Sequence, residues 1–263
     1  MIKSIFKYRK LIWDFVVRDY KSRFAGSSLG FLWNIINPLI LIVIYAVIFT
    51  NVMGAKLQIL GIVNKFNYSI FLCSGIVPWL AFAEVLSRSS GIYLENANLI
   101  KKMAFPEEIL NVYVVVSASI NFLITFTIYL IFLMIVKYPI SWYMLLVIPI
   151  FILQMLFVGT LGLAVSSLAV FFRDILQMVN VLIQLWFWGT PIIYQMDAIP
   201  LSVRKIIMLN PMYYFIEAYH KVIMEGKLPD KFHIIMMLII VFISTIIGSL
   251  TFKKLKSEIP DEI

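Results

Sequence analysis

Six long apolar runs dominate this chain of 263 residues, and no other feature constrains its fold as strongly. A helix needs about 20 apolar residues to cross the ~30 Å hydrocarbon core of a bilayer, and most of the runs reach that length. In lipid the backbone must satisfy its own hydrogen bonds, so each run is predicted to be a helix. The predicted spans are residues 29–51, 68–93, 109–136, 142–172, 175–194 and 232–252.

The composition agrees with an all-α integral membrane protein. Hydrophobic residues make up 62% of the chain and charged residues 14%, far from the values of a soluble domain. The net charge of +8 does not indicate nucleic-acid binding, because the basic residues cluster beside the apolar runs. Anionic lipid head groups are the expected partners of these charges.

The distribution of basic residues predicts the orientation in the cytoplasmic (inner) membrane. Positive residues accumulate on the cytoplasmic side of short loops. The basic N-terminal segment, the pair Lys101 and Lys102, Arg173 and the basic residues after the last run all fall on one side. We therefore predict a multi-pass protein with both termini in the cytoplasm.

Residues 1–28 are predicted to form an amphipathic helix on the cytoplasmic membrane surface, and residues 29–263 the transmembrane domain. Apolar residues such as Phe6, Ile12 and Phe15 recur every three or four positions, which gives the helix one apolar face. No apolar core with a cleavage site is present, so this is not a signal peptide. The basic face is assigned to Lys7, Arg9, Lys10, Arg18 and Arg23.

The segment 94–105, between the second and third runs, is short and amphipathic. One interpretation is a small exposed helix that a soluble partner contacts; the other is an ordinary cytoplasmic loop with topology-setting lysines. The candidate contact residues are Glu95, Asn98, Leu99, Ile100, Lys101, Lys102 and Phe105.

The external segment 199–225 is predicted to contain two short helices. One follows Pro200, and the other has Asn210 as its N-cap and Pro211 at its first helical position. Both are too short to cross the membrane and too apolar for a solvated loop. A re-entrant helical hairpin between the fifth and sixth runs accounts for both properties.

Catalytic and metal-binding patterns are missing from the sequence. The one Gly-Lys pair, Gly226 and Lys227, lacks the remainder of a phosphate-binding loop, so the chain is not expected to hydrolyse ATP alone. Two histidines and one cysteine do not supply a metal site, and no cofactor is expected. Glu84 and Arg88, four residues apart, are predicted to form a helical ion pair rather than an ion-coupling site.

Two further patterns concern packing and aromatic surfaces. Small residues at Gly159, Gly162 and Ser166 share one helical face and predict a close helix contact. Aromatic rings can anchor helices at the membrane interface or stack on sugar rings along an export path. The candidates for the path are Trp186, Trp188, Tyr194, Tyr213 and Tyr214, whereas Phe49 on the first run is expected to face lipid.

Several short motifs, in this order and on this topology, resemble the permease subunits of ABC-2 type polysaccharide exporters, which export O-antigen, capsule or teichoic acid. The resemblance covers nearly the whole chain and is strongest to O-antigen exporter permeases. The motifs are Arg18-Asp19-Tyr20-Lys21-Ser22-Arg23, Ser28-Leu29-Gly30-Phe31-Leu32-Trp33, Asn37-Pro38-Leu39, Asn98-Leu99-Ile100-Lys101-Lys102 with Phe105-Pro106, Phe171-Phe172-Arg173-Asp174, Pro191-Ile192-Ile193-Tyr194 and Asn210-Pro211.

The resemblance implies a homodimer of permeases with two separate ATPase subunits, which bind ATP and Mg and drive export of a polyprenyl-linked glycan. It also implies that 94–105 is the coupling helix and that the external helices gate the exit. An ABC-2 drug or lipid exporter is the alternative with the same fold. A membrane glycosyltransferase is disfavoured because the sequence lacks an Asp-x-Asp pair.

Overall fold

The computed structural model describes residues 2–48, 65–102 and 105–263, and the described part is all-helical, as predicted. Strands are not found within these ranges. The elements are α1 (Ile2–Lys7), α2 (Arg9–Arg23), η1 (Gly30–Leu32), α3 (Trp33–Val47), α4 (Asn67–Glu95), α5 (Ala97–Lys102), α6 (Glu108–Ile135), η3 (Trp142–Leu146), α7 (Val147–Phe171), α8 (Ile175–Trp188), η4 (Met196–Ala198), α9 (Leu201–Ile207), α10 (Pro211–His220), η5 (Lys221–Glu225), α11 (Lys231–Leu255) and α12 (Ile259–Glu262).

Among the described residues, five helical segments are long and apolar enough to cross a membrane, one fewer than the six spans predicted. They are Gly30–Val47, Asn67–Glu95, Glu108–Ile135, Trp142–Phe171 and Lys231–Leu255. The predicted fifth span appears as α8, which has 14 residues and ends at Trp188. Gly189 forms its C-cap, and Pro191 follows two residues later, a sequence that stops a helix. Residues 49–51 of the predicted first span lie outside the described residues.

Helix α4 forms the centre of the bundle. It packs against α3, α6, α7, α8 and α10, and most of its residues are buried. A fully buried glutamine joins three of these helices: Gln154 Nε2 on α7 donates to the Pro78 carbonyl (2.7 Å) on α4, and its Oε1 accepts from Tyr219 Oη (2.9 Å) on α10. Pro78 lacks the N–H that would bond the Ser74 carbonyl, and Gln154 donates instead to the carbonyl of Pro78 itself.

The predicted small-residue face on α7 is confirmed as a packing surface. A Cβ added to Gly159 would lie 3.1 Å from Val115 Cγ2 on α6, and one added to Gly162 would lie 2.8 Å from Ser89 Cβ on α4. Ser166 is buried as well. On the other side of α7, Gly248 of α11 lies so close to Thr160 that an added Cβ would collide with its carbonyl oxygen.

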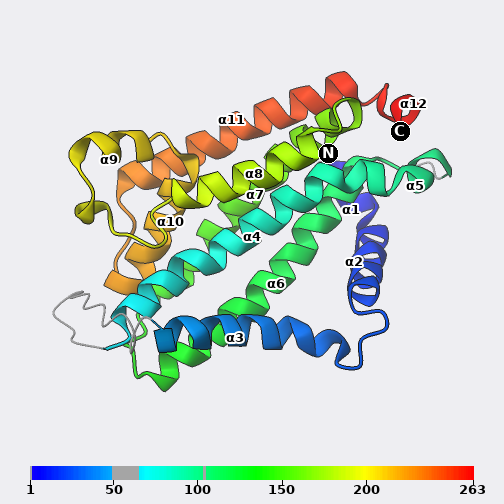
Figure 1. The fold of residues 1–263 in the computed structure, drawn as a ribbon. Helices are drawn as coiled ribbons and strands as arrows, with labels where there is room; N and C mark the ends of the chain where they lie inside the picture. Colours follow the sequence, from blue (N-terminus) through cyan, green and yellow to red (C-terminus); the bar gives the residue numbers. More distant parts are fainter. Residues whose placement is uncertain (1, 49–64, 103–104) are drawn as a thin grey trace.

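The two ends of the bundle carry different elements. In Figure 1, α1, α5, α12 and the end of α11 gather at one end, whereas α9 and the start of α11 lie at the opposite end. The chain labels N and C both lie at the first end. Both termini of the described chain are therefore on one side of the bundle.

The predicted helix over residues 1–28 is two helices instead of one. The chain breaks at Tyr8, and α2 ends at Arg23, before a turn in which Gly26 has φ +78°. A positive φ favours glycine and ends helical geometry. Ile12, Phe15 and Val16 are buried in a cluster with residues of α6, so part of the apolar face covers protein.

Candidate functional site

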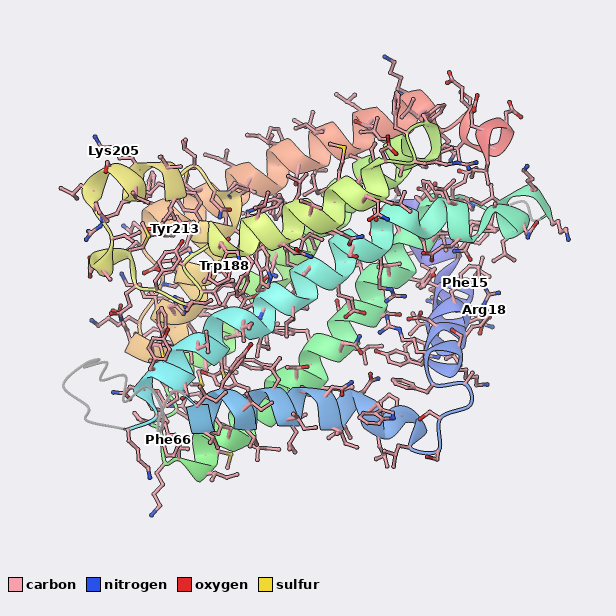
Figure 2. All side chains as sticks on the ribbon, in the orientation of Figure 1. Phe15, Arg18, Phe66, Trp188, Lys205 and Tyr213 are labelled. Atoms are coloured by element: carbon pink, nitrogen blue, oxygen red, sulfur yellow. The ribbon has the colours of Figure 1, made fainter. Side chains whose placement is uncertain are left out.

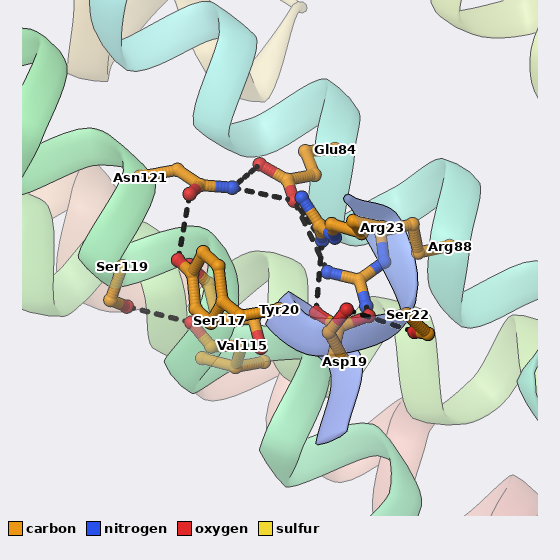
Figure 3. A network of polar contacts seen from close by, with 10 residues as sticks. All are labelled: Asp19, Tyr20, Ser22, Arg23, Glu84, Arg88, Val115, Ser117, Ser119 and Asn121. Carbon is orange, nitrogen blue, oxygen red and sulfur yellow. Dashed lines mark hydrogen bonds and ion pairs between the residues drawn. The ribbon is translucent and has the colours of Figure 1, made fainter. Parts of the chain in front are cut away.

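Four charged side chains join α2 to α4 and form the charge cluster: Asp19, Arg23, Glu84 and Arg88 (Figure 3). Arg23 Nη2 lies 2.7 Å from Glu84 Oε1 and 3.2 Å from Asp19 Oδ2. Arg88 completes the ring, with Nη2 2.7 Å from Asp19 Oδ1 and Nη1 3.1 Å from Glu84 Oε1. Two cations and two carboxylates balance, and only 14–26% of each side chain is exposed.

Helix α6 closes the charge cluster through neutral polar groups. Asn121 Nδ2 donates to both oxygens of Glu84, at 3.0 and 2.9 Å. Tyr20 Oη donates to Asn121 Oδ1 at 2.7 Å and lies 3.0 Å from the Ser117 carbonyl oxygen. Burial raises the pKa of Tyr20 to about 12, so the hydroxyl stays a donor at physiological pH.

The predicted Glu84–Arg88 pair is confirmed, but it is half of a larger arrangement. The ion pairs that Asp19 and Arg23 make were not predicted from the sequence. A signal was present, because Asp19 and Arg23 have the same four-residue spacing as Glu84 and Arg88. Where the two helices meet, each arginine contacts both carboxylates, and these ion pairs hold α2 against the bundle.

The segment 94–105 contains a shorter helix than predicted. Leu94 and Glu95 belong to α4, and Asn96 separates it from α5 while its Nδ2 donates to the Ile92 carbonyl (2.9 Å). Residues 103 and 104 lie outside the described residues. Of the predicted contact residues, Leu99, Ile100 and Phe105 are half-buried, and the exposed ones are Glu95, Asn98, Lys101 and Lys102.

The half-buried residues of this segment pack on the N-terminal helices. The rings of Phe105 and Phe15 lie 5.9 Å apart, and Leu99 and Ile100 contact the same buried cluster. The exposed side of α5 is consequently its polar side. A partner protein would meet Asn98, Lys101 and Lys102.

The basic residues of α1 and α2 divide into two groups. Lys7, Arg9, Lys10 and Arg18 are exposed, as a head-group-binding face would require. The guanidinium carbon of Arg18 also lies over the Phe15 ring, 5.5 Å from its centroid. Both residues are labelled in Figure 2. Arg23 instead turns into the charge cluster.

Asn210 organises the hairpin, which comprises α9, α10 and their connections. Its Oδ1 accepts from Met212 N (2.9 Å), the predicted N-cap bond, and from Trp186 Nε1 (2.6 Å). Its Nδ2 donates to the Gly189 carbonyl and to Thr190 Oγ1, both at 2.8 Å. The N-cap and the proline at the first helical position are confirmed, and the same side chain ties α10 to the end of α8.

The five candidate aromatic residues differ in exposure. Trp188 is 67% exposed, whereas Trp186 and Tyr194 are half-buried. Tyr194 Oη donates to the Trp188 carbonyl at 2.9 Å. Tyr213 and Tyr214 are buried, with ring centroids 5.0 Å apart, and both rings contact His233. Trp188 is the candidate that this chain leaves most open to a ligand.

A polar cavity of about 370 Å³ lies between the hairpin, α4 and the start of α11. Its size is that of a small-molecule site rather than of a polymer channel. Lys221 Nζ donates to Asp230 Oδ2 at 2.7 Å, and this bond lowers the pKa of Asp230. The ionisable lining residues are Asp197, Arg204, Glu217, His220, Glu225, Asp230 and His233.

The described residues form a bundle of long apolar helices, with α5 at one end and the hairpin at the other, which is the architecture of an integral membrane protein. The sequence model of the ABC-2 type transporter family matches residues 10–224. The chain therefore belongs to the ABC-2 type transporter family.

Curated relatives resemble the chain over most of its length. The O-antigen export system permease protein RfbA of Klebsiella pneumoniae is 35% identical over 91% of this chain and 89% of the relative. RfbA of Myxococcus xanthus is 29% identical over 88% and 86%, respectively. The polysialic acid transport protein KpsM of Escherichia coli is 22% identical over 88% of both chains.

Proposed function

We propose that this chain is the permease subunit of an ATP-driven transporter that exports an O-antigen polysaccharide across the cytoplasmic membrane. The similarity to O-antigen export permeases over about nine tenths of both chains carries this proposal. The more distant relative also transports a polysaccharide, which does not favour the drug or lipid alternative. The exported molecule is a polyprenyl-linked glycan in this proposal.

A second copy of the chain and two ATPase subunits complete the transporter. The exposed lysines of α5, Lys101 and Lys102, suit contact with a protein partner. We assign the ATPase to this end of the bundle. ATP and Mg are bound by that partner. The chain itself then contributes no catalytic residue, and its role is to move the glycan.

In the bilayer, α8 completes a sixth crossing. With 14 residues it measures about 21 Å, short of the full hydrocarbon thickness. However, α7 ends near α12, whereas η5 lies beside η3 at the start of α7. The intervening chain must return across the bundle, which supports six crossings with both termini in the cytoplasm. Labelling of a cysteine at Lys10 from the outside would contradict this topology.

The hairpin re-enters the membrane from the outside and gates the exit, and α2 lies on the cytoplasmic surface. Apolar residues of α9 are exposed on the protein, including Leu201 (73%) and Ile206 (68%), which supports contact with lipid or a second copy. On α2, Trp13 is 57% exposed beside the basic residues, as expected of an interfacial helix.

The proposal is tested in a strain whose own copy of this gene is deleted. Surface O-antigen should disappear and lipid-linked glycan should accumulate inside, and the wild-type chain should restore export. The double variant Lys101→Glu/Lys102→Glu should restore less than about a tenth of it, because like charges across an interface cost several kcal/mol. Surface glycan is measured by immunoblotting of intact cells.

Lys231→Glu is the matched control, since Lys231 is an exposed lysine at the start of α11, at the opposite end of the molecule and outside the hairpin. It should restore export fully. Undiminished surface O-antigen in the deleted strain would disprove the proposed function. Normal export by the double variant would disprove only the role of α5.

The glycan path is tested at Trp188. The double variant Trp188→Ala/Tyr194→Ala should lower export about three- to tenfold, because a stacking contact contributes about 0.5–1.5 kcal/mol. ATPase association should be unchanged. Trp142→Ala is the matched control, as Trp142 is an 87% exposed tryptophan in η3; Phe49 lies outside the described residues. Equal losses in both variants would assign these rings to membrane anchoring.

A further inference from the structure

The segment that follows α11 packs on the body of the protein. Helix α12 has only four residues, too few to be stable by itself. Ile259 is nevertheless fully buried, in the same cluster as Phe15 of α2 and Ile109 of α6. Its order therefore comes from tertiary packing and not from helix propensity.

A lysine at the end of α11 attaches this segment a second time. Lys256 Nζ lies 3.3 Å from Glu108 Oε2 and 3.6 Å from Glu107 Oε2, at the first turn of α6. The Glu107 side chain is only 14% exposed and the Glu108 side chain only 7%. Lys256 is paired with both of these adjacent, largely buried carboxylates, so its removal would leave two like charges side by side.

These attachments place α12 against α5. The two helices are in contact, and both lie at the same end of the bundle (Figure 1). Their exposed charges are of opposite sign: Lys101 and Lys102 on α5, and Glu258, Asp261 and Glu262 at α12. Exposed groups of opposite charge therefore lie on two neighbouring helices.

Helix α5 is too small to bind a protein partner by itself. A specific protein interface takes about 20–30 residues on each side, and α5 has six residues, of which Leu99 and Ile100 point into the protein. A docked ATPase must contact further elements at this end. One element at this end that contacts α5 is α12, in the segment 256–263.

We propose that residues 256–263 and α5 form one docking surface for the ATPase subunit, in which the acidic groups of α12 pair with basic groups of the partner. This inference rests on the proposed function. The basic residues of α5 contact acidic groups of the same partner. Lys256 and Ile259 hold the two halves in register.

The test measures the affinity of the purified permease for its ATPase in detergent solution. The triple variant Glu258→Gln/Asp261→Asn/Glu262→Gln keeps Lys256 and Ile259, so it should fold normally. We expect about tenfold weaker association and a smaller dependence on salt, as for interfacial charges. Ile259→Ser should detach α12 and weaken association similarly.

Two controls separate the possible failures. Lys101→Glu/Lys102→Glu reports on α5 alone, and Lys231→Glu reports on an exposed charge at the opposite end of the bundle. If the double variant loses the ATPase while the triple and Ile259→Ser variants bind it as tightly as wild type, the docking role of 256–263 is disproved. If all of them bind normally, the assignment of the ATPase to this end, part of the proposed function, is wrong as well.

Discussion

Replacing Gly248 with alanine should destabilise the protein more than any other single methyl group added to a glycine of the bundle. The new Cβ would collide with the Thr160 carbonyl oxygen and lie 2.9 Å from the carbonyl carbon. These are backbone atoms of α7, which cannot rotate away as a side chain can. Overpacking of this kind costs about 1–3 kcal/mol, and Gly248→Val should cost more.

The melting temperature of the purified protein in detergent measures this effect. Gly248→Ala should lower it by about 4–10 °C, and Gly248→Val should reduce the amount of folded protein in the membrane. Gly189→Ala is the control, because its Cβ would lie 3.6 Å from the nearest atom, an ordinary contact. If the Gly248 and Gly189 variants melted alike, α7 and α11 would not be packed as closely as described.

Removal of one cation from the charge cluster should loosen α2 from the bundle. In Arg88→Gln, Asp19 and Glu84 share Arg23 alone, and one carboxylate loses its close partner. Breaking a buried pair costs about 3–5 kcal/mol; the 14–26% exposure of these side chains reduces our expectation to about 1–3 kcal/mol. Export should fall with the loss of α2 docking.

A double-mutant cycle identifies the interaction itself. Asp19→Asn with Arg88→Gln should be less destabilising than the sum of the single variants, by about 0.5–3 kcal/mol. Arg18→Gln is the matched control, since Arg18 lies on the same helix and is exposed. Strict additivity, or an equal effect of Arg18→Gln, would show that the charge cluster does not hold α2.

The sequence predicts those features of the fold that depend on local patterns. Apolar run length predicts the five long helices, the Asn210–Pro211 pair predicts the start of α10, and four-residue spacing predicts the Glu84–Arg88 pair. The end of α8 at Trp188 was not predicted, although Gly189 and Pro191, which follow it, carry a local stop signal. Each of these needs only residues within one or two helical turns.

Features that depend on tertiary packing were not predictable. Asp19 contacts Arg88 across 69 positions, and no local pattern fixes where α2 lies on the bundle. An aromatic residue such as Tyr214 suits lipid, glycan or protein equally well by composition, and its burial is decided by the placement of α11. The contact of α12 with α5 likewise follows from the path of α11 through the whole bundle.

The central position of α4 has a consequence for how the two ends of the protein communicate. Its 29 residues form a rod of about 43 Å that continues into α5 at one end. Nearer the other end, Pro78 is bound to Gln154, and Gln154 is bound to Tyr219 of the hairpin. A tilt of α4 would therefore move α5 at one end of the bundle and the hairpin at the other end together. Gln154, which bonds both α4 and α10, would be the side chain that transmits the movement of α4 to the hairpin.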